Sequence, residues 1–157
     1  MKIFDATAVI AFLSDMNYPE GLEQLSKYYE IIIPKGVADE ITKSPGKEIL
    51  QDFAKQKVVK IVNVDPEKVT QIQNENPQLH QGECEAIVYG QTYAGEKKFC
   101  IVSDDSKARK LFPMLNFKWT ERLLDIMKEK GIIDSSTHSS KINKLKKSAF
   151  YSRGMKK

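Results

Sequence analysis

Short apolar segments alternate with helix-forming segments along almost the whole chain, and this alternation most restricts how it can fold. Runs rich in β-branched and aromatic residues predict strands over Lys2–Phe4, Glu30–Ile33, Val58–Val64 and Phe99–Val102, with a short edge strand over Phe117–Trp119. Helices are expected over Ala6–Leu13, from Pro19, and over Lys35–Thr42, Lys47–Lys55, Pro66–Glu75, Glu83–Tyr93, Ser106–Phe112, Thr120–Lys130 and Ser139–Ser148. This order predicts a three-layer α/β/α sandwich around a mainly parallel sheet.

Charge divides the 157 residues into two unequal parts. The net charge is +4, but residues 138–157 contain seven basic residues and no acidic one, namely Lys141, Lys144, Lys146, Lys147, Arg153, Lys156 and Lys157. The preceding residues are therefore net acidic. We interpret residues 1–137 as the main domain, and residues 138–157 as a basic helix or tail that packs on it or extends from it. Such a segment suits a polyanionic partner, although a solvated helix would have the same composition.

The remaining composition favours a cytoplasmic protein without membrane association. No apolar run approaches the ~20 residues that a membrane helix needs, and the first residues do not resemble a signal peptide. Cys84 and Cys100 have no partners at metal-ligand spacing, so we expect two buried, reduced thiols.

Carboxylates follow two of the expected strands directly. Asp5 ends the first strand, and Asp104 and Asp105 end the fourth. The carboxyl ends of parallel strands form the edge where α/β proteins bind ligands. Each residue also has a structural alternative, because aspartate caps helices well. Consecutive residues diverge, so we expect one of Asp104 and Asp105 to point inward and the other to cap the next helix.

Three glutamates lie on expected helices. Glu40 could be an ordinary solvent-facing residue, and Glu83 stands in a first turn, where the helix dipole favours an anion in any case. Glu85 follows two positions later and should point in nearly the opposite direction. We therefore expect Glu85 to be a bystander on the far face of its helix.

Several carboxylates at one edge repel one another unless a cation is present. Oxygen ligands without histidine or cysteine favour Mg²⁺ or Mn²⁺, which bind phosphate oxygens and activate water. His80 and His138 lack partners for a zinc site, and the chain has no glycine-rich phosphate loop or dinucleotide motif. Thr7 stands where dehalogenase-type phosphatases need a second aspartate, and the acid pair comes too late for a response-regulator receiver.

The motifs, in their order and spacing, resemble those of PIN domain nucleases over most of the chain. The matching segments are Phe4–Ile10 with Asp5, Ile33–Ile41 with Glu40, Gly82–Ile87 with Glu83, Val102–Arg109 with Asp104 and Asp105, the closing residues Thr120, Leu123, Leu124 and Lys130–Ile133, and the basic, aromatic Lys144, Leu145, Phe150 and Tyr151. The family's Ser/Thr-x-Asp form selects Asp105, whereas the strand-end position selects Asp104, and both are retained.

The resemblance implies a Mg²⁺- or Mn²⁺-dependent endoribonuclease similar to the toxins of toxin–antitoxin pairs, with a homodimer and a small antitoxin protein as expected partners. It assigns Asp5, Glu83 and one of Asp104 and Asp105 to the metal, and Glu40 to the attacking water or to completion of the site. Thr7 and Ser103 would support these ligands or contact phosphate. The expected contacts to the RNA backbone are Lys141, Lys144, Lys146, Lys147 and Arg153. The alternatives are a non-cleaving RNA- or protein-binding module, and DNA-directed nuclease or phosphatase activity.

Overall fold

Five parallel strands form one central sheet in the computed structural model of this protein, which describes residues 1–96 and 98–148. The strands are β1 (Lys2–Phe4), β2 (Ile31–Pro34), β3 (Lys60–Val62), β4 (Cys100–Val102) and β5 (Phe117–Lys118), in the order β3-β2-β1-β4-β5. In register, Phe4 pairs with Val102 across β1 and β4. The predicted parallel sheet is therefore confirmed, with β1 at its centre.

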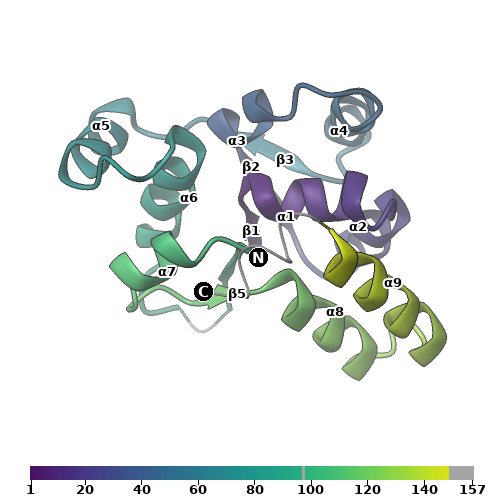
Figure 1. The fold of residues 1–157 in the computed structure, drawn as a ribbon. Helices are drawn as coiled ribbons and strands as arrows, with labels where there is room; N and C mark the ends of the chain where they lie inside the picture. Colours follow the sequence, from purple (N-terminus) through teal and green to yellow (C-terminus); the bar gives the residue numbers. More distant parts are fainter. Residues whose placement is uncertain (97, 149–157) are drawn as a thin grey trace.

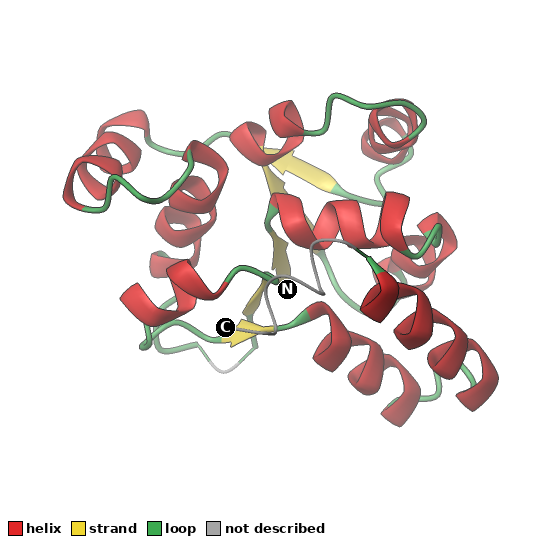
Figure 2. Ribbon diagram, in the orientation of Figure 1, coloured by secondary structure: helices red, strands yellow, loops and turns green. Residues whose placement is uncertain are grey.

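Helices cover both faces of this sheet (Figures 1 and 2). They are α1 (Ala6–Ile10), the π-helix η1 (Ala11–Asp15), α2 (Pro19–Ser26), α3 (Lys35–Glu40), α4 (Gly46–Lys55), α5 (Pro66–Glu75), α6 (Gln81–Gln91), α7 (Ser106–Leu111), α8 (Thr120–Glu129) and α9 (Ser135–Lys147). Figure 2 shows the strands between a group formed by α5, α6 and α7 and a group that includes α1, α2, α8 and α9.

Alternating strand residues supply two separate apolar cores. Phe4, Ile33 and Val102 belong to the core beneath α1, α2, α4, α8 and α9, whereas Ile3 and Ile101 belong to the core beneath α5, α6 and α7. Successive side chains of a strand point to opposite faces, which is why a continuous apolar run can fill both cores. The three-layer α/β/α sandwich expected from the sequence is thus confirmed.

Two helices differ from their expected limits. The segment expected as one helix over residues 6–13 is a short α-helix that continues as a π-helix to Asp15. The last helix begins at Ser135 rather than Ser139, because Asp134 accepts a hydrogen bond from the Thr137 N–H at 2.7 Å and caps it. In both places, polar residues that were expected to lie in loops belong to a helix instead.

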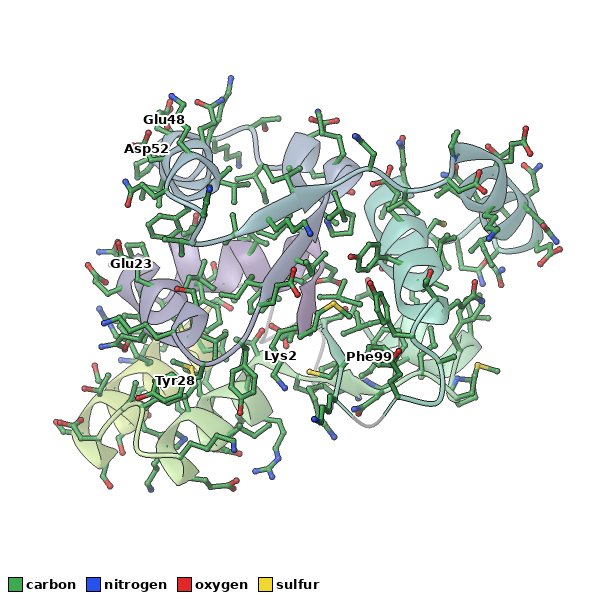
Figure 3. All side chains as sticks on the ribbon, turned by 180° about the vertical axis from the view of Figure 1, so that it is seen from behind. Lys2, Glu23, Tyr28, Glu48, Asp52 and Phe99 are labelled. Atoms are coloured by element: carbon green, nitrogen blue, oxygen red, sulfur yellow. The ribbon has the colours of Figure 1, made fainter. Side chains whose placement is uncertain are left out.

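The amino ends of the parallel strands lie together at one edge of the sheet. Lys2 begins β1 and Phe99 precedes β4, and the two lie near each other in Figure 3. Cys84 and Cys100 are buried and unpaired, as expected. Within the described residues, no helix is both long and apolar enough to span a membrane.

Candidate active site at the carboxyl end of the sheet

The topology brings the first and last acidic segments together. Strands β1 and β4 are neighbours, and the Asp5 N–H donates to the carbonyl of Val102 at 3.1 Å. The residues that follow both strands, Asp5 and Ser103, therefore lie side by side at the carboxyl edge. Nearly a hundred residues separate them in the sequence, and only the parallel register joins them.

Asp5 is the most deeply buried carboxylate at this edge, with 2% of its surface exposed. Its Oδ1 accepts hydrogen bonds from the Thr7 hydroxyl at 2.6 Å and from the Ala8 N–H at 3.0 Å, and its Oδ2 accepts from the Ser103 hydroxyl. Asp5 thus also caps α1, the structural role considered for it. Burial nevertheless raises the pKa of Asp5 to about 7, despite the three donors, and the charge of Asp104 adds to this effect.

Two hydroxyls connect Asp5 to the loop after β4. Thr7 Oγ1 accepts a hydrogen bond from the Asp104 N–H at 2.9 Å, and Ser103 Oγ accepts one from the Asp105 N–H at 3.2 Å. Each hydroxyl therefore donates to Asp5 and accepts from the β4–α7 loop. Thr7 and Ser103 orient the acids at this edge.

Asp105 and Glu83 form the half-buried part of the site. Asp105 caps α7 by accepting from the Lys107 N–H at 2.8 Å, and Glu83 accepts from the His80 N–H at 2.8 Å at the start of α6. Burial raises the pKa of Glu83, and the negative charge of Asp105 raises it further. The two carboxylates therefore repel each other, which a cation between them would relieve.

Asp104 faces the start of α8, away from Glu83 and Asp105. Its Oδ1 accepts from the Thr120 N–H at 2.8 Å, at the first turn of α8. Burial raises the pKa of Asp104, against the opposing effects of the Thr120 hydrogen bonds and the Arg109 guanidinium. Arg109 lies 3.9 Å from the ring centre of Trp119 and is also close to Asp104. The two aspartates diverge as expected, although both also serve as helix caps.

Glu40 reaches the site from the end of α3. Its Oε1 accepts from the Gly82 N–H at 3.1 Å, at the amino end of α6 and next to Glu83. A Cβ at position 82 would lie 3.1 Å from a Val37 methyl group and 3.2 Å from the carboxyl carbon of Glu40. Gly82 is therefore required for this close approach, and the exposed Glu40 remains open to solvent on its other side.

Glu85 corrects an expectation. It is not a bystander on a far face but a buried residue between α6 and α3, and it accepts from the Gly36 N–H at 2.6 Å and from Gln81 Nε2 at 3.1 Å. The far face of α6 is not free, because α6 packs against α3 as well as α5. Glu85 therefore neutralises the amino end of α3.

The predicted RNA-binding residues of the C-terminal segment divide into two groups. Lys141 lies 4.3 Å from the ring centre of Tyr18, and Lys146 pairs with Glu121 at 3.3 Å. Lys144 and Lys147 line a surface cavity instead. Arg153 lies outside the described residues.

Asp15 is a further acidic residue near the site, and the sequence did not predict it there. This half-buried residue ends η1, and its charge raises the pKa of Asp104. Its backbone position depends on the π-helix, which leaves no recognisable pattern in a sequence. Asp15 is therefore an additional acidic residue near the predicted set.

The acidic side chains of the site suit a hard cation, although in this structure they accept hydrogen bonds from the protein itself. Among residues 1–96 and 98–148, no group of three or more acidic, histidine or cysteine side chains has a ready metal-binding arrangement. The acids at the edge offer only oxygen ligands, which Mg²⁺ and Mn²⁺ prefer. The burial of the Asp5 carboxylate, which raises its pKa, and the repulsion between Glu83 and Asp105 both fit such an ion.

Comparison with known families agrees with this geometry. A family model described as a PIN domain matches residues 1–154. The chain therefore belongs to the PIN domain family, whose fold is of the nuclease type. No curated protein and no solved structure shows significant similarity to it.

Proposed function

We propose that this protein is a metal-dependent endoribonuclease that hydrolyses phosphodiester bonds at the carboxyl edge of the sheet. The observation that carries the proposal is the burial of Asp5 beside other acids, with a pKa raised to about 7. A carboxylate that is buried at this cost in free energy fits a residue that binds a cation. Glu83 and Asp105 add a second pair of mutually repelling carboxylates at the same edge.

Asp5, Glu83 and Asp105 are the residues that we assign to Mg²⁺ or Mn²⁺. Asp104 is the less favoured ligand, because it faces Thr120 and the Arg109 guanidinium, whereas the charge of Asp105 acts on Glu83. When bound, the ion would stabilise negative charge on the phosphate and lower the pKa of water. Glu40, the exposed acid at the amino end of α6, is suited to accept a proton from the attacking water.

Thr7 and Ser103 act through the acids. Both hydroxyls already donate to Asp5, so their main contribution is to hold its two oxygens in fixed directions. Lys144 and Lys147 are the residues of α9 that we assign to the RNA backbone, because Lys141 and Lys146 have partners within the protein.

The direct test is cleavage of RNA in the presence of Mn²⁺ by the wild type, by Asp5→Asn and by Asp52→Asn. Asp52 is an exposed residue of α4, marked in Figure 3, and serves as the matched control. We expect cleavage by the wild type and the control, and a loss of at least a hundredfold in Asp5→Asn. Equal rates for all three proteins would refute the assignment. Parallel assays with single-stranded and flap DNA distinguish a DNA nuclease.

A second candidate function is that of a non-cleaving module that binds RNA or protein. The hydrogen bonds that engage Asp5, and the helix-capping bonds of Glu83 and Asp105, favour it, because each is a sufficient structural role. Calorimetry with Mn²⁺ separates the candidates. RNA binding without any heat of metal binding supports the module, and metal binding that disappears in Asp5→Asn supports the nuclease.

The biological role that we propose is that of a cytoplasmic toxin of a toxin–antitoxin pair, acting as a homodimer. This rests on the similarity of the motifs to that subgroup of PIN domain proteins. Expression of the wild type without an antitoxin should stop growth, and expression of Asp5→Asn should not. Light scattering should give twice the mass of one chain. Growth arrest by both variants, or a monomer in solution, would contradict the corresponding part.

A further inference from the structure

Asp15 occupies an unusual position between the acidic edge and the basic helix α9. It ends the π-helix η1, a rare conformation that often occurs at functional sites. Asp15 is half-buried, and no hydrogen bond or ion pair joins its carboxylate to another described residue. An accessible carboxylate with two open oxygens is available to hydrogen-bond donors of a ligand.

Two cavities meet at Asp15. The first, of about 320 Å³, is lined by Asp15 together with Ile10, Ser14, Glu40, Ile41, Thr42 and Lys43. The second, of about 380 Å³, is lined by Asp15 together with Asn17, Lys144, Lys147 and Ser148. Asp15 lines both cavities and Glu40 lines the first, so the two adjoin at Asp15, between the acidic edge and α9. We name this the Asp15 groove.

The two ends of the Asp15 groove have different chemistry. The first cavity combines the side chain of Ile10, 39% exposed, with the carboxylates of Asp15 and Glu40. The exposed Ile10 side chain suits the flat face of a base, and the two carboxylates suit its N–H groups, with Lys43 at the rim of the same cavity. The second cavity offers the ammonium groups of Lys144 and Lys147, which suit a phosphate.

We propose that the Asp15 groove binds single-stranded RNA, with a base in the first cavity and the adjoining backbone phosphate at Lys144 and Lys147, and that Asp15 selects the base. This rests on the proposed function and specifies its substrate. Guanine fits best, because its N1–H and N2–H donors lie side by side and match the two oxygens of one carboxylate. A base in a duplex cannot reach the cavity, so the RNA must be single-stranded there.

Binding is measured by fluorescence anisotropy in the Asp5→Asn background, so that the RNA stays intact. The probes are short single-stranded oligonucleotides that carry either guanine or inosine at each position, since inosine lacks only the N2 amino group. We expect the inosine change at one position to weaken binding on the order of tenfold. Adding Asp15→Ala should abolish the difference between the two probes, whereas adding Asp52→Ala should preserve it.

Salt dependence tests the phosphate end of the groove. Lys147→Gln should weaken binding of all probes to a similar degree and reduce the slope of log affinity against log salt by about one unit. Lys57→Gln, an exposed lysine of the loop before β3, is the matched control and should change neither.

Three outcomes would overturn the proposal. They are equal affinity for the guanine and inosine probes, a preference that survives Asp15→Ala, and binding of a duplex as tightly as a single strand. A groove that serves a protein partner would give the first of these. The nuclease proposal is judged separately, by Mn²⁺-dependent cleavage in the wild type. Cleavage without base preference would refute the Asp15 groove alone, and base-selective binding without cleavage would refute the nuclease alone.

Discussion

Replacing Asp5 by asparagine should separate stability from activity. Burial raises the pKa of Asp5 from its ordinary 3.8 to about 7, so the folded protein holds a proton between these values that the unfolded chain has released. The contribution of Asp5 to stability is therefore fully present below pH 4 and is lost as the pH rises through about 7. With one pKa unit equal to ~1.4 kcal/mol, the loss between pH 5 and pH 8 amounts to ~2–3 kcal/mol.

The asparagine that replaces Asp5 has no proton to lose and retains the size of the side chain. Its amide can still accept from Thr7 and can donate to Ser103, at a cost of about 1 kcal/mol for the weaker hydrogen bonds. The free energy of unfolding of Asp5→Asn should thus be slightly lower than that of the wild type at pH 5 and ~1–2 kcal/mol higher at pH 8. The variant should nevertheless have lost RNA cleavage.

Urea denaturation of both proteins at pH 5 and pH 8, without divalent ions and followed by circular dichroism, measures this difference. The other titrating groups are common to both proteins and largely cancel. Adding Mn²⁺ at pH 8 should then stabilise the wild type and leave Asp5→Asn unchanged. A difference in stability that does not vary with pH would refute the reasoning, because it would mean that Asp5 is ionised without penalty in the fold.

Three further predictions concern other parts of the fold. Gly82→Ala should reduce cleavage and destabilise the protein by ~1–3 kcal/mol, because the new methyl group displaces the Glu40 carboxylate. Thermal denaturation and the cleavage assay measure the two effects, and an unchanged activity would contradict the prediction. Asp105→Asn should reduce Mn²⁺ affinity in calorimetry more than Asp104→Asn, and the reverse order would exchange the two assignments. Leu145→Ala should destabilise the protein by ~2–5 kcal/mol in urea if α9 is part of the core, and a loss below ~0.5 kcal/mol would indicate a helix that packs only loosely.

Most of the fold could be derived from local patterns. The β-branched run before Pro34 and the apolar run before Ser103 predict buried strands, and their alternation with helices fixes a parallel sheet. What could not be derived is how helices end and continue. The π-helix at Asp15 and the early start of α9 at Ser135 depend on tertiary packing and on one side-chain cap, neither of which has a periodic signal.

The placement of the predicted acids in the fold could be derived from the sequence, whereas their contacts could not. The position of Asp5 at a strand end follows from the parallel sheet, and Glu83 follows from the motif around Gly82. The role predicted for Glu85 was wrong, because residue spacing along a helix does not reveal which faces of α6 are covered by neighbouring helices. Asp15 was missed because its proximity to Asp104 is a property of the folded chain.

Metal soaking of crystals tests the central claim most directly. Crystals of the wild type soaked in Mn²⁺ should show an anomalous difference peak between the carboxylates of Asp5, Glu83 and Asp105, and crystals of Asp5→Asn treated in the same way should show none. A peak bound through Asp104 in place of Asp105 would change the ligand set and keep the claim. The absence of any peak at the carboxyl edge of the wild type, under conditions in which RNA is cleaved, would contradict it.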